Sequence, residues 1–428
     1  MTEKHRILGV DYADDVEASY DKGELGDRPL IEEIMDHAAE AGMTHVAWRV
    51  SHLGKLTYPT QVGTVQDGHR AIRPSLTPFG LILKRCDPVR VAVEAAHERG
   101  LKMLFYICLF DECYELPDGI KSESWLGEQH PEYYLEHHNK DHEGPRHVRG
   151  VFSLSYEEVH DYFLAIVREG LDRGCDGVYL DVARTHAGAN PISVYGWWPE
   201  WTNPYLAYGY NDPDVERYRS RYGEDPPLGD PNGPSEAEAN WNRVRGEALT
   251  DFMRSVRPLA NSFGATVDIC QYPTTYNGFN PGYPCRQQLG RFHVDWETWA
   301  HERLIDSIRL NVDHGRFGYD DWMAHSAQTY KKVQEMGVRV YVDCGLEGYY
   351  NLLEDAPAPL PIDKSAQPEL YFGLMAKMVG KMLSTSADGV FYYEHNNGDA
   401  RVWQTLRTAH DDARELRAPW DALPLSPP

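Results

Sequence analysis

Acidic side chains follow several short apolar runs of the chain, and these carboxylates offer the clearest chemistry in the sequence. The sharpest case is the segment CDGVYLDVAR, in which Gly177 to Leu180 form an apolar run and Asp181 comes directly after it. One carboxyl group kept protonated and a second kept charged are the minimum for hydrolysing a glycosidic bond. Asp181 is therefore the leading candidate for a catalytic nucleophile or charge stabiliser, and an ion pair with Arg184 is the structural alternative.

Other apolar runs also end in polar residues. Glu394 and Glu347 are the two candidates for the carboxylic acid that would deliver a proton to the leaving oxygen. The candidates for substrate binding, which offer hydrogen bonds, charge or a flat ring, are Asp11, Trp48, Arg49, Asp111, Arg184, Trp197, Asp268, Gln271, Tyr272, Asn311, His314, Asp343 and His395. We expect burial to raise some carboxyl pKa values while arginines hold other carboxylates ionised.

Arg49, within the segment AWRVSH, raises the question of an acidic substrate. An arginine after an apolar run is costly to bury unless a negative group meets it. If the substrate supplies that group, the sugar is an acidic one such as a uronic acid, because a guanidinium binds a carboxylate at two points. If Asp11 or Asp111 supplies it, the role of Arg49 is structural.

Metal-dependent catalysis is the main alternative to glycosidic bond hydrolysis by two carboxyl groups. The first apolar run reads GVDYADD and lacks the HxH pair that opens many metal-dependent amidohydrolase barrels. Asp11, Asp268, Asp343 and His314 could still hold a divalent ion through mainly oxygen ligands. The prediction is that the protein has no metal and no cofactor; a metal-dependent isomerase, lyase or hydrolase and a non-catalytic sugar-binding barrel are the other two readings.

The elements that position these residues follow from eight short apolar runs bounded by turn residues, each of which predicts a strand. Between them lie segments such as PLIEEIMDHAAEAGM, whose apolar residues recur at spacings of three and four, as in amphipathic helices. Eight such alternations predict a (β/α)8 barrel with its site at the carboxyl ends of the strands; the alternative, a doubly wound open sheet, lacks its GxGxxG loop. The expected strands are Ile7–Tyr12, His45–Ser51, Lys102–Asp111, Gly177–Arg184, Ala265–Tyr272, Asp306–His314, Arg339–Gly345 and Gly389–His395.

The 428 residues are predicted to form a single catalytic domain, since barrels with long loops reach this length. The segment Thr185–Asn240 is rich in Trp, Tyr, Pro, Gly and Asn and shows neither helical nor strand periodicity. It predicts a long loop after the fourth strand, on the substrate face, with Trp197 as a stacking surface. The alternative is a loop that packs on its own aromatic residues.

The composition of the chain indicates which classes of partner are not expected. The formal charge of −24, from 42 Lys and Arg against 66 Asp and Glu, would repel a phosphate backbone, so nucleic acid is not expected as a partner. Neither an export signal nor a membrane span is expected, because no long apolar run is present. Seven cysteines, an odd number without CxxC spacing, indicate reduced thiols and a cytoplasmic protein. The oligomeric state is left open.

Several separated segments are similar, in order, to the glycosyl hydrolase-like barrels related to glycoside hydrolase family 10, which include bacterial peptidoglycan glycosidases. The resemblance covers most of the chain and implies the same barrel, a glycosidase acting on an oligo- or polysaccharide, and a catalytic role for Asp181 as the family's strand-four aspartate. The chain departs from the family in having ICQYP where a Ser-Pro strand end is common, and the family's second carboxylate matches no single position. The matching segments are DPVRVAVEAAHERGLKMLFYI, HPEYYLEHHNKD, VHDYFLAIVREGLDRGCDGVYLDVAR, WNRVRGEALTDFMRSVRP and DWETWAHERLIDSIRLN.

Overall fold

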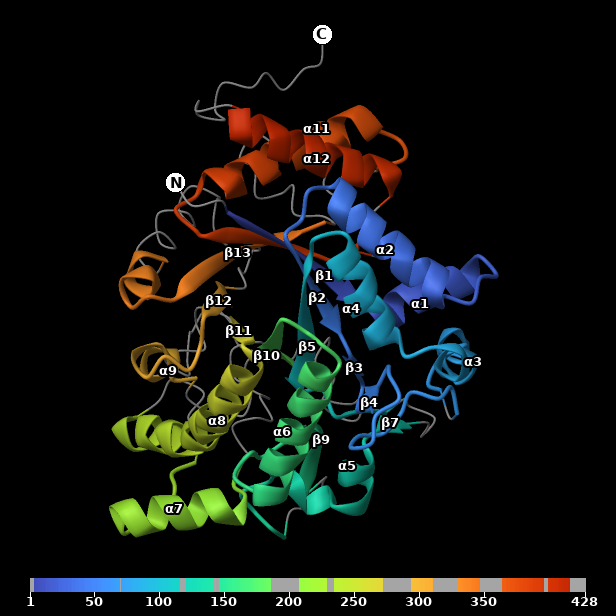
Figure 1. Cartoon of the computed structure of the whole chain (residues 1–428). Coiled ribbons are helices and arrows are strands. Elements are labelled where there is room, and N and C mark those ends of the chain that lie inside the picture. Colours follow the sequence, from blue (N-terminus) through green and yellow to red (C-terminus); the bar gives the residue numbers. More distant parts are fainter. Residues whose placement is uncertain are drawn as a thin grey trace.

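Eight parallel strands close into a barrel in the order β1-β14-β13-β12-β11-β10-β5-β2, with helices around it (Figure 1), so the predicted (β/α)8 fold is confirmed. The computed structural model describes residues 4–69, 71–115, 121–141, 143, 146–185, 208–228, 235–271, 294–310, 330–346, 364–395 and 399–415. The barrel strands are β1 (His5–Asp11), β2 (His45–Arg49), β5 (Lys102–Phe110), β10 (Gly177–Thr185), β11 (Thr266–Gln271), β12 (Ser307–Leu310), β13 (Arg339–Gly345) and β14 (Gly389–Tyr393).

Each barrel strand corresponds to one of the predicted apolar runs. β13 has the expected bounds, and the other strands except β12 differ by at most two residues at either end. The largest difference is in the sixth strand, where β12 ends at Leu310 and the residues that were expected to finish it, Asn311 to His314, lie outside the described part of the chain.

Helices cover the outside of the barrel, and short hairpins lie beyond the carboxyl ends of its strands (Figure 1). The helices are α1 (Tyr12–Asp21), α2 (Arg28–Glu40), α3 (Phe79–Arg85), α4 (Pro88–Glu98), α5 (Trp125–Gln129), α6 (Glu157–Asp172), α7 (Asp212–Tyr222), α8 (Glu236–Phe263), α9 (Trp296–His301), α11 (Pro368–Ser384) and α12 (Ala400–Glu415), with single 3-10 turns η1 (Pro74–Leu76) and η2 (Pro131–Tyr133). The hairpins are β3 (Ser51–His52) with β4 (Lys55–Leu56), β6 (Cys113–Glu115) with β7 (Lys121–Glu123), and β8 (Tyr134–Glu136) with β9 (His147–Phe152).

Local sequence accounts for the helices. In α4, for example, the Asp87 side chain accepts hydrogen bonds from the backbone N–H groups of Val89 and Arg90, and Pro88 occupies the first turn, where a missing N–H costs nothing. Val89, Ala92, Val93 and Ala96 then recur at helical spacing and are buried against the barrel. Capping residues and an apolar stripe therefore fix both the start of the helix and the face that it turns inward.

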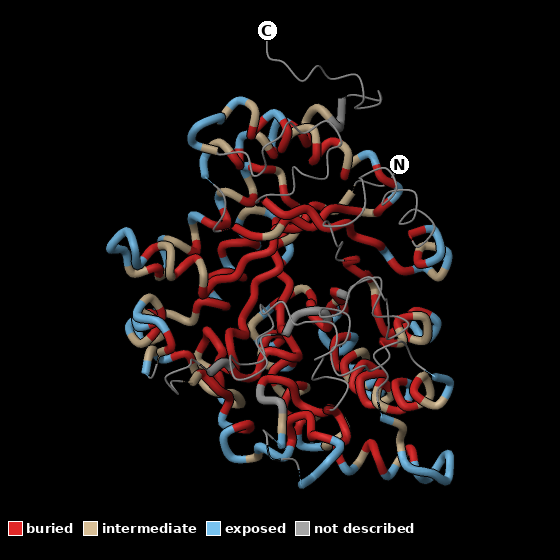
Figure 2. Tube along the Cα trace, turned by 180° about the vertical axis from the view of Figure 1, so that it is seen from behind, coloured by how far each residue is buried: buried red, intermediate tan, exposed pale blue. Residues whose placement is uncertain are grey.

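The two faces of each barrel strand belong to two different cores, because successive side chains point to opposite sides. Tyr179 of β10 and Phe391 of β14 stack with ring centroids 5.1 Å apart, although these strands are not neighbours, so both rings lie inside the barrel. A larger core fills the space between strands and helices, and Figure 2 shows buried residues along the strands and exposed ones at helix ends and loops. The inner core consists of Ile7, Ala47, Leu104, Tyr106, Cys108, Tyr179, Cys270, Tyr341 and Phe391.

The prediction of an aperiodic loop over Thr185–Asn240 is wrong for its second half. Helix α7 lies within this segment, and α8 begins in it at Glu236. Val215 and Tyr218, three residues apart, pack with Tyr210, Trp241 and Val244 in a small core of their own. The many charges of DPDVERYRSRY concealed this short apolar stripe. Residues 186–207 and 229–234, among them Trp197, lie outside the described residues.

None of the described helices is both long and apolar enough to cross a membrane. The six cysteines that the structure describes are free thiols. The cytoplasmic location expected from composition stays a prediction.

Candidate active site

Buried charged residues gather at the carboxyl ends of the barrel strands. Asp11 and Arg49 are the last residues of β1 and β2, while Asp111 and Glu394 directly follow β5 and β14. Asp181 is the last residue of β10 that pairs in regular register with β5 before the register shifts. All five are at most 7% exposed. Charged groups buried to this degree require partners, and those partners define two halves of the mouth.

The first half of the mouth surrounds Asp181. The Tyr106 hydroxyl donates a hydrogen bond of 2.7 Å to the Asp181 carboxylate. Nearby, Arg309 on β12 donates to Asp343 at 2.6 Å and to the Tyr179 hydroxyl at 3.3 Å. Burial raises the pKa of Asp343, the Arg309 guanidinium opposes that rise, and the charge of Asp181 adds to it. Asp181 and Asp343 therefore share one electrostatic environment.

Arg309 is a member of this half that the sequence prediction missed. Its guanidinium lies 4.0 Å from the centre of the Phe391 ring, in the barrel interior. The signal was a charged residue inside an apolar run, SIRL, where a cation is buried only if a carboxylate meets it.

The second half of the mouth is organised by Arg49. Its two terminal amino groups contact the carboxylates of Asp11 and Asp111. Asp111 also accepts a 3.3 Å hydrogen bond from the Leu53 backbone N–H. The structural alternative for Arg49 is thus the arrangement observed, and a contact between its guanidinium and a substrate carboxylate stays a prediction.

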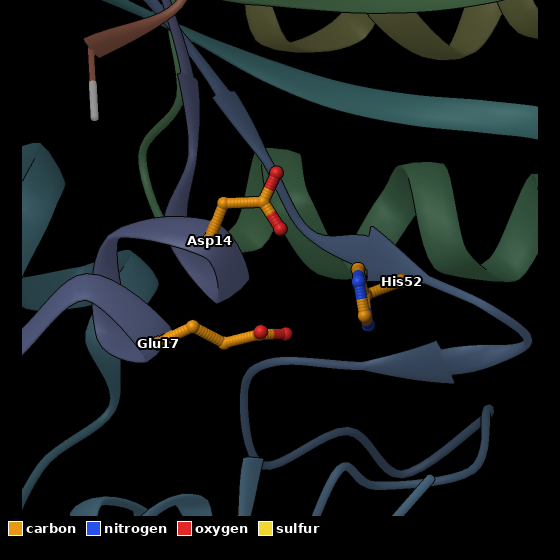
Figure 3. A group of neighbouring side chains, drawn as sticks. All are labelled: Asp14, Glu17 and His52. Atoms are coloured by element: carbon orange, nitrogen blue, oxygen red, sulfur yellow. The ribbon is translucent and has the colours of Figure 1, made fainter. Parts of the chain in front are cut away.

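Asp14 joins this half from the first turn of α1, and the sequence prediction missed it. Its side chain hydrogen-bonds with that of Glu394; burial raises the pKa of Asp14 to about 9, the charges of Asp11 and Glu394 add to the rise, and Arg49 opposes it. The available signal was the spacing in DYADD, because three residues in a helix return Asp14 to the side of Asp11. Figure 3 shows Asp14 with its other neighbours, Glu17 and His52.

Two residues predicted at the mouth have their side chains packed against elements outside the barrel. Trp48, one residue before Arg49, packs outside the barrel with its ring 4.8 Å from Tyr12. His395, one residue after Glu394, contacts Asp15 through Nδ1 at 2.7 Å and stacks on Trp403. The predictions that Trp48 and His395 bind substrate are wrong. Trp48 faces away from the mouth because neighbouring residues of a strand point to opposite sides, and His395 is buried against Asp15 and Trp403.

Asp268 is also misplaced by the prediction. It lies in the middle of β11 and pairs in register with Ser307, the first residue of β12, so it belongs to the amino-terminal half of the barrel. Its carboxylate accepts hydrogen bonds from Ser307 and, at 2.6 Å, from Thr266. Burial raises the pKa of Asp268 to about 6. Asp268 is therefore an internal polar group in the middle of its strand and not a strand-end residue like Asp11. His314, another member of the alternative metal set, lies outside the described residues.

The remaining predicted residues cannot be placed beside these groups. Arg184 and Gln271 have their backbones in β10 and β11, and their side chains lie outside the described part of the structure. The other predicted residues outside the described part are Trp197, Tyr272, Asn311, His314 and Glu347.

Glu112 gives a prediction on stability. It follows Asp111 and is buried, and burial raises its pKa to about 8 against hydrogen bonds from Ser124 and Tyr162 that lower it. The unfolded chain releases this proton near pH 4.5 and the folded protein holds it to about pH 8. The protonated Glu112 therefore contributes fully to the stability of the fold below pH 4.5, and this contribution is lost as the pH rises to about 8. We expect Glu112→Gln to remove this pH-dependent loss of stability. From pH 4.5 to about 8, the free energy of unfolding of the variant should therefore rise relative to that of the wild type.

Urea unfolding at a series of pH values measures this difference, with the exposed Glu128→Gln as matched control. Parallel pH profiles for the wild type and Glu112→Gln would contradict the assignment.

Known proteins resemble this chain only weakly, both in sequence and in structure. No family model and no curated protein matches the chain, so the resemblance to family-10-related barrels stays a prediction. The α-galactosidase AgaA of glycoside hydrolase family 36 from Geobacillus stearothermophilus matches at 10% identity and a TM-score of 0.44, over 97% of this chain and 42% of its own. The C-terminal domain of a protein assigned as a chitinase, from Desulfitobacterium hafniense, matches at 12% identity and a TM-score of 0.45, over 96% of this chain and 99% of that domain.

The α-galactosidase TtGalA from Thermus thermophilus matches at 12% identity and a TM-score of 0.42, over 96% of this chain and 62% of its own. This chain thus spans less than two thirds of the length of either α-galactosidase. The identities and scores are too low to indicate a reaction, and the barrel itself is established by its own strand pairing.

Proposed function

We propose that the protein hydrolyses glycosidic bonds in an oligo- or polysaccharide, with Asp181 as nucleophile or charge stabiliser and Glu394 as the proton donor. The observation that carries the proposal is the position of their strands. β10 and β14 are four strands apart in a closed barrel of eight, and are therefore opposite each other. Glycoside hydrolysis needs two carboxyl groups that flank one bond.

The barrel interior supports this arrangement. Tyr179, two residues before Asp181, and Phe391, three residues before Glu394, stack on each other across the barrel. A sugar ring that packs on these two aromatic side chains would lie between the two carboxyl groups. The two groups also have different partners, a tyrosine hydroxyl for Asp181 and a second carboxyl group for Glu394, which is the asymmetry that separate roles require.

The predicted preference for an acidic sugar is weakened. Arg49 and Arg309 both contact protein carboxylates, so the described arginines of the mouth already have anionic partners. Arg184 is the remaining basis for that preference. Matched pairs of substrates that differ only in a uronic acid or its neutral sugar test it, and equal kcat/KM values within a pair would exclude an acidic preference.

The test of the proposal is hydrolysis of a panel of aryl glycosides and oligosaccharides in ¹⁸O-labelled water. Hydrolysis places the label at the anomeric carbon of the product, whereas a lyase gives an unsaturated sugar without label. Glu394→Gln should abolish release from substrates with poor leaving groups and spare those with good ones, because only the former need a proton donor. Binding of sugars without turnover by the wild type would instead indicate the non-catalytic alternative.

A further inference from the structure

Three metal-ligating side chains meet at the rim of the mouth. Asp14 and Glu17 extend from α1 towards His52 on β3 (Figure 3). One possible ligand atom of each residue lies within 4.8 Å of those of the other two. We propose that Asp14, Glu17 and His52 bind one divalent cation of the first transition series, such as Zn²⁺ or Mn²⁺. This site does not rest on the proposed hydrolysis, although the Asp14 side chain also hydrogen-bonds with that of Glu394, the proposed proton donor.

Local structure holds the three ligands in place. Asp14 and Glu17 are three residues apart in α1 and so share one face of the helix. His52 belongs to a two-residue strand whose turn contains Leu53 and Gly54, both at positive φ. A Cβ on Gly54 would come within 2.2 Å of the Glu112 carbonyl oxygen, so this turn is seated tightly on the end of β5. His52 is 4% exposed, and its ring is therefore oriented before any ligand arrives.

The donor set selects the class of ion. Two carboxylates and one imidazole suit zinc, manganese or iron, whereas calcium and magnesium favour sites made of oxygen alone. Ligands about 2.1 Å from a common ion lie roughly 3.4 Å apart, so ligand atoms that lie within 4.8 Å of one another need to approach by at most about 1.4 Å. Three protein ligands leave at least one coordination position for water or substrate.

The charge at this corner of the mouth also favours a cation. Glu17 already attracts one, since Arg73 contacts both of its carboxylate oxygens at 3.1 Å. The Arg73 side chain is 48% exposed, so its hold on Glu17 is weakened by solvent. Asp11 places further negative charge beside Asp14, which the Arg49 guanidinium partly opposes. A metal ion at Glu17 would therefore compete with Arg73 and gain from the surrounding carboxylates.

This competition allows two substitutions with opposite expected effects. Glu17→Gln removes a ligand, and Arg73→Ala removes the competitor of the ion. Both abolish the same ion pair, so loss of that pair cannot explain a difference in sign. We expect Glu17→Gln to weaken binding at least tenfold and Arg73→Ala to strengthen it by up to about fivefold, the equivalent of an exposed ion pair.

Isothermal titration of the untagged, metal-free chain with Zn²⁺ and Mn²⁺, and with Mg²⁺ for comparison, measures these effects without any substrate. The expected result is one transition-metal ion per chain and weaker Mg²⁺ binding. His97→Gln is the matched histidine control, because His97 pairs with Asp176 just before β10, at the opposite end of the barrel. No binding by the wild type, or binding that Glu17→Gln leaves unchanged, would overturn the proposal. His52→Ala should lose binding as well, with circular dichroism verifying its fold.

Discussion

Asp181→Asn is expected to lower turnover by about 10⁴-fold while leaving the protein folded. An asparagine keeps the shape of the side chain, and its amide oxygen can still accept the hydrogen bond that the Tyr106 hydroxyl donates at 2.7 Å. What disappears is the negative charge that would attack or stabilise the developing oxocarbenium ion. Because Asp181 also adds to the charge around Asp343, its neutralisation removes a repulsion and should not reduce stability. Measuring kcat and the melting temperature on the same preparations checks both statements.

Asp176→Asn is the matched control for this substitution. Asp176 accepts hydrogen bonds from Lys102, His97 and the Met103 backbone N–H just before β10, at the opposite end of the barrel. The Asp176→Asn variant should therefore be less stable than the wild type and keep the turnover of the wild type. If Asp181→Asn behaved in the same way as Asp176→Asn, Asp181 would be a structural residue and the proposed mechanism would fail.

The barrel was predictable because its determinants are local. Each strand is a short apolar run bounded by turn residues, and each crossover helix carries a stripe of buried residues at helical spacing, as in α4. Helix α7 was missed because its apolar stripe is short and lies among charged residues that face solvent. Its apolar residues pack against Trp241 in α8, a tertiary contact with a separate element.

The site was harder to predict because a one-residue difference decides which core a side chain enters. Trp48 and Arg49 are adjacent, yet only Arg49 faces the mouth. Asp268 was assigned to a strand end, but it lies in the middle of β11, where it pairs with the first residue of β12. Asp14 reaches Glu394 only because β1 and β14 are neighbours in the closed barrel, a pairing between residues at opposite ends of the sequence.

Arg49→Met is expected to destabilise the protein by about 3–5 kcal/mol, the typical cost of breaking a buried ion pair by removing one partner. The guanidinium joins Asp11 and Asp111, whose side chains are 1% and 0% exposed. Methionine retains most of the apolar stem of arginine, so the cavity it leaves is small, and the main loss is the charge. Two buried carboxylates would then face each other without the cation that links them. Urea unfolding, analysed at constant m-value, measures the difference.

An exposed ion pair provides the comparison that assigns this cost to burial. Arg99 contacts Asp36 at 2.7 Å, with 55% of the Asp36 side chain exposed, so Arg99→Met should cost only about 0–1 kcal/mol. Adding Asp111→Asn to Arg49→Met should restore part of the lost stability, because it removes one of the two uncompensated charges. Equal costs for Arg49→Met and Arg99→Met would show that water or a shifted proton already neutralises the carboxylates at the mouth. In that case Arg49 would again be available to meet a negatively charged substrate.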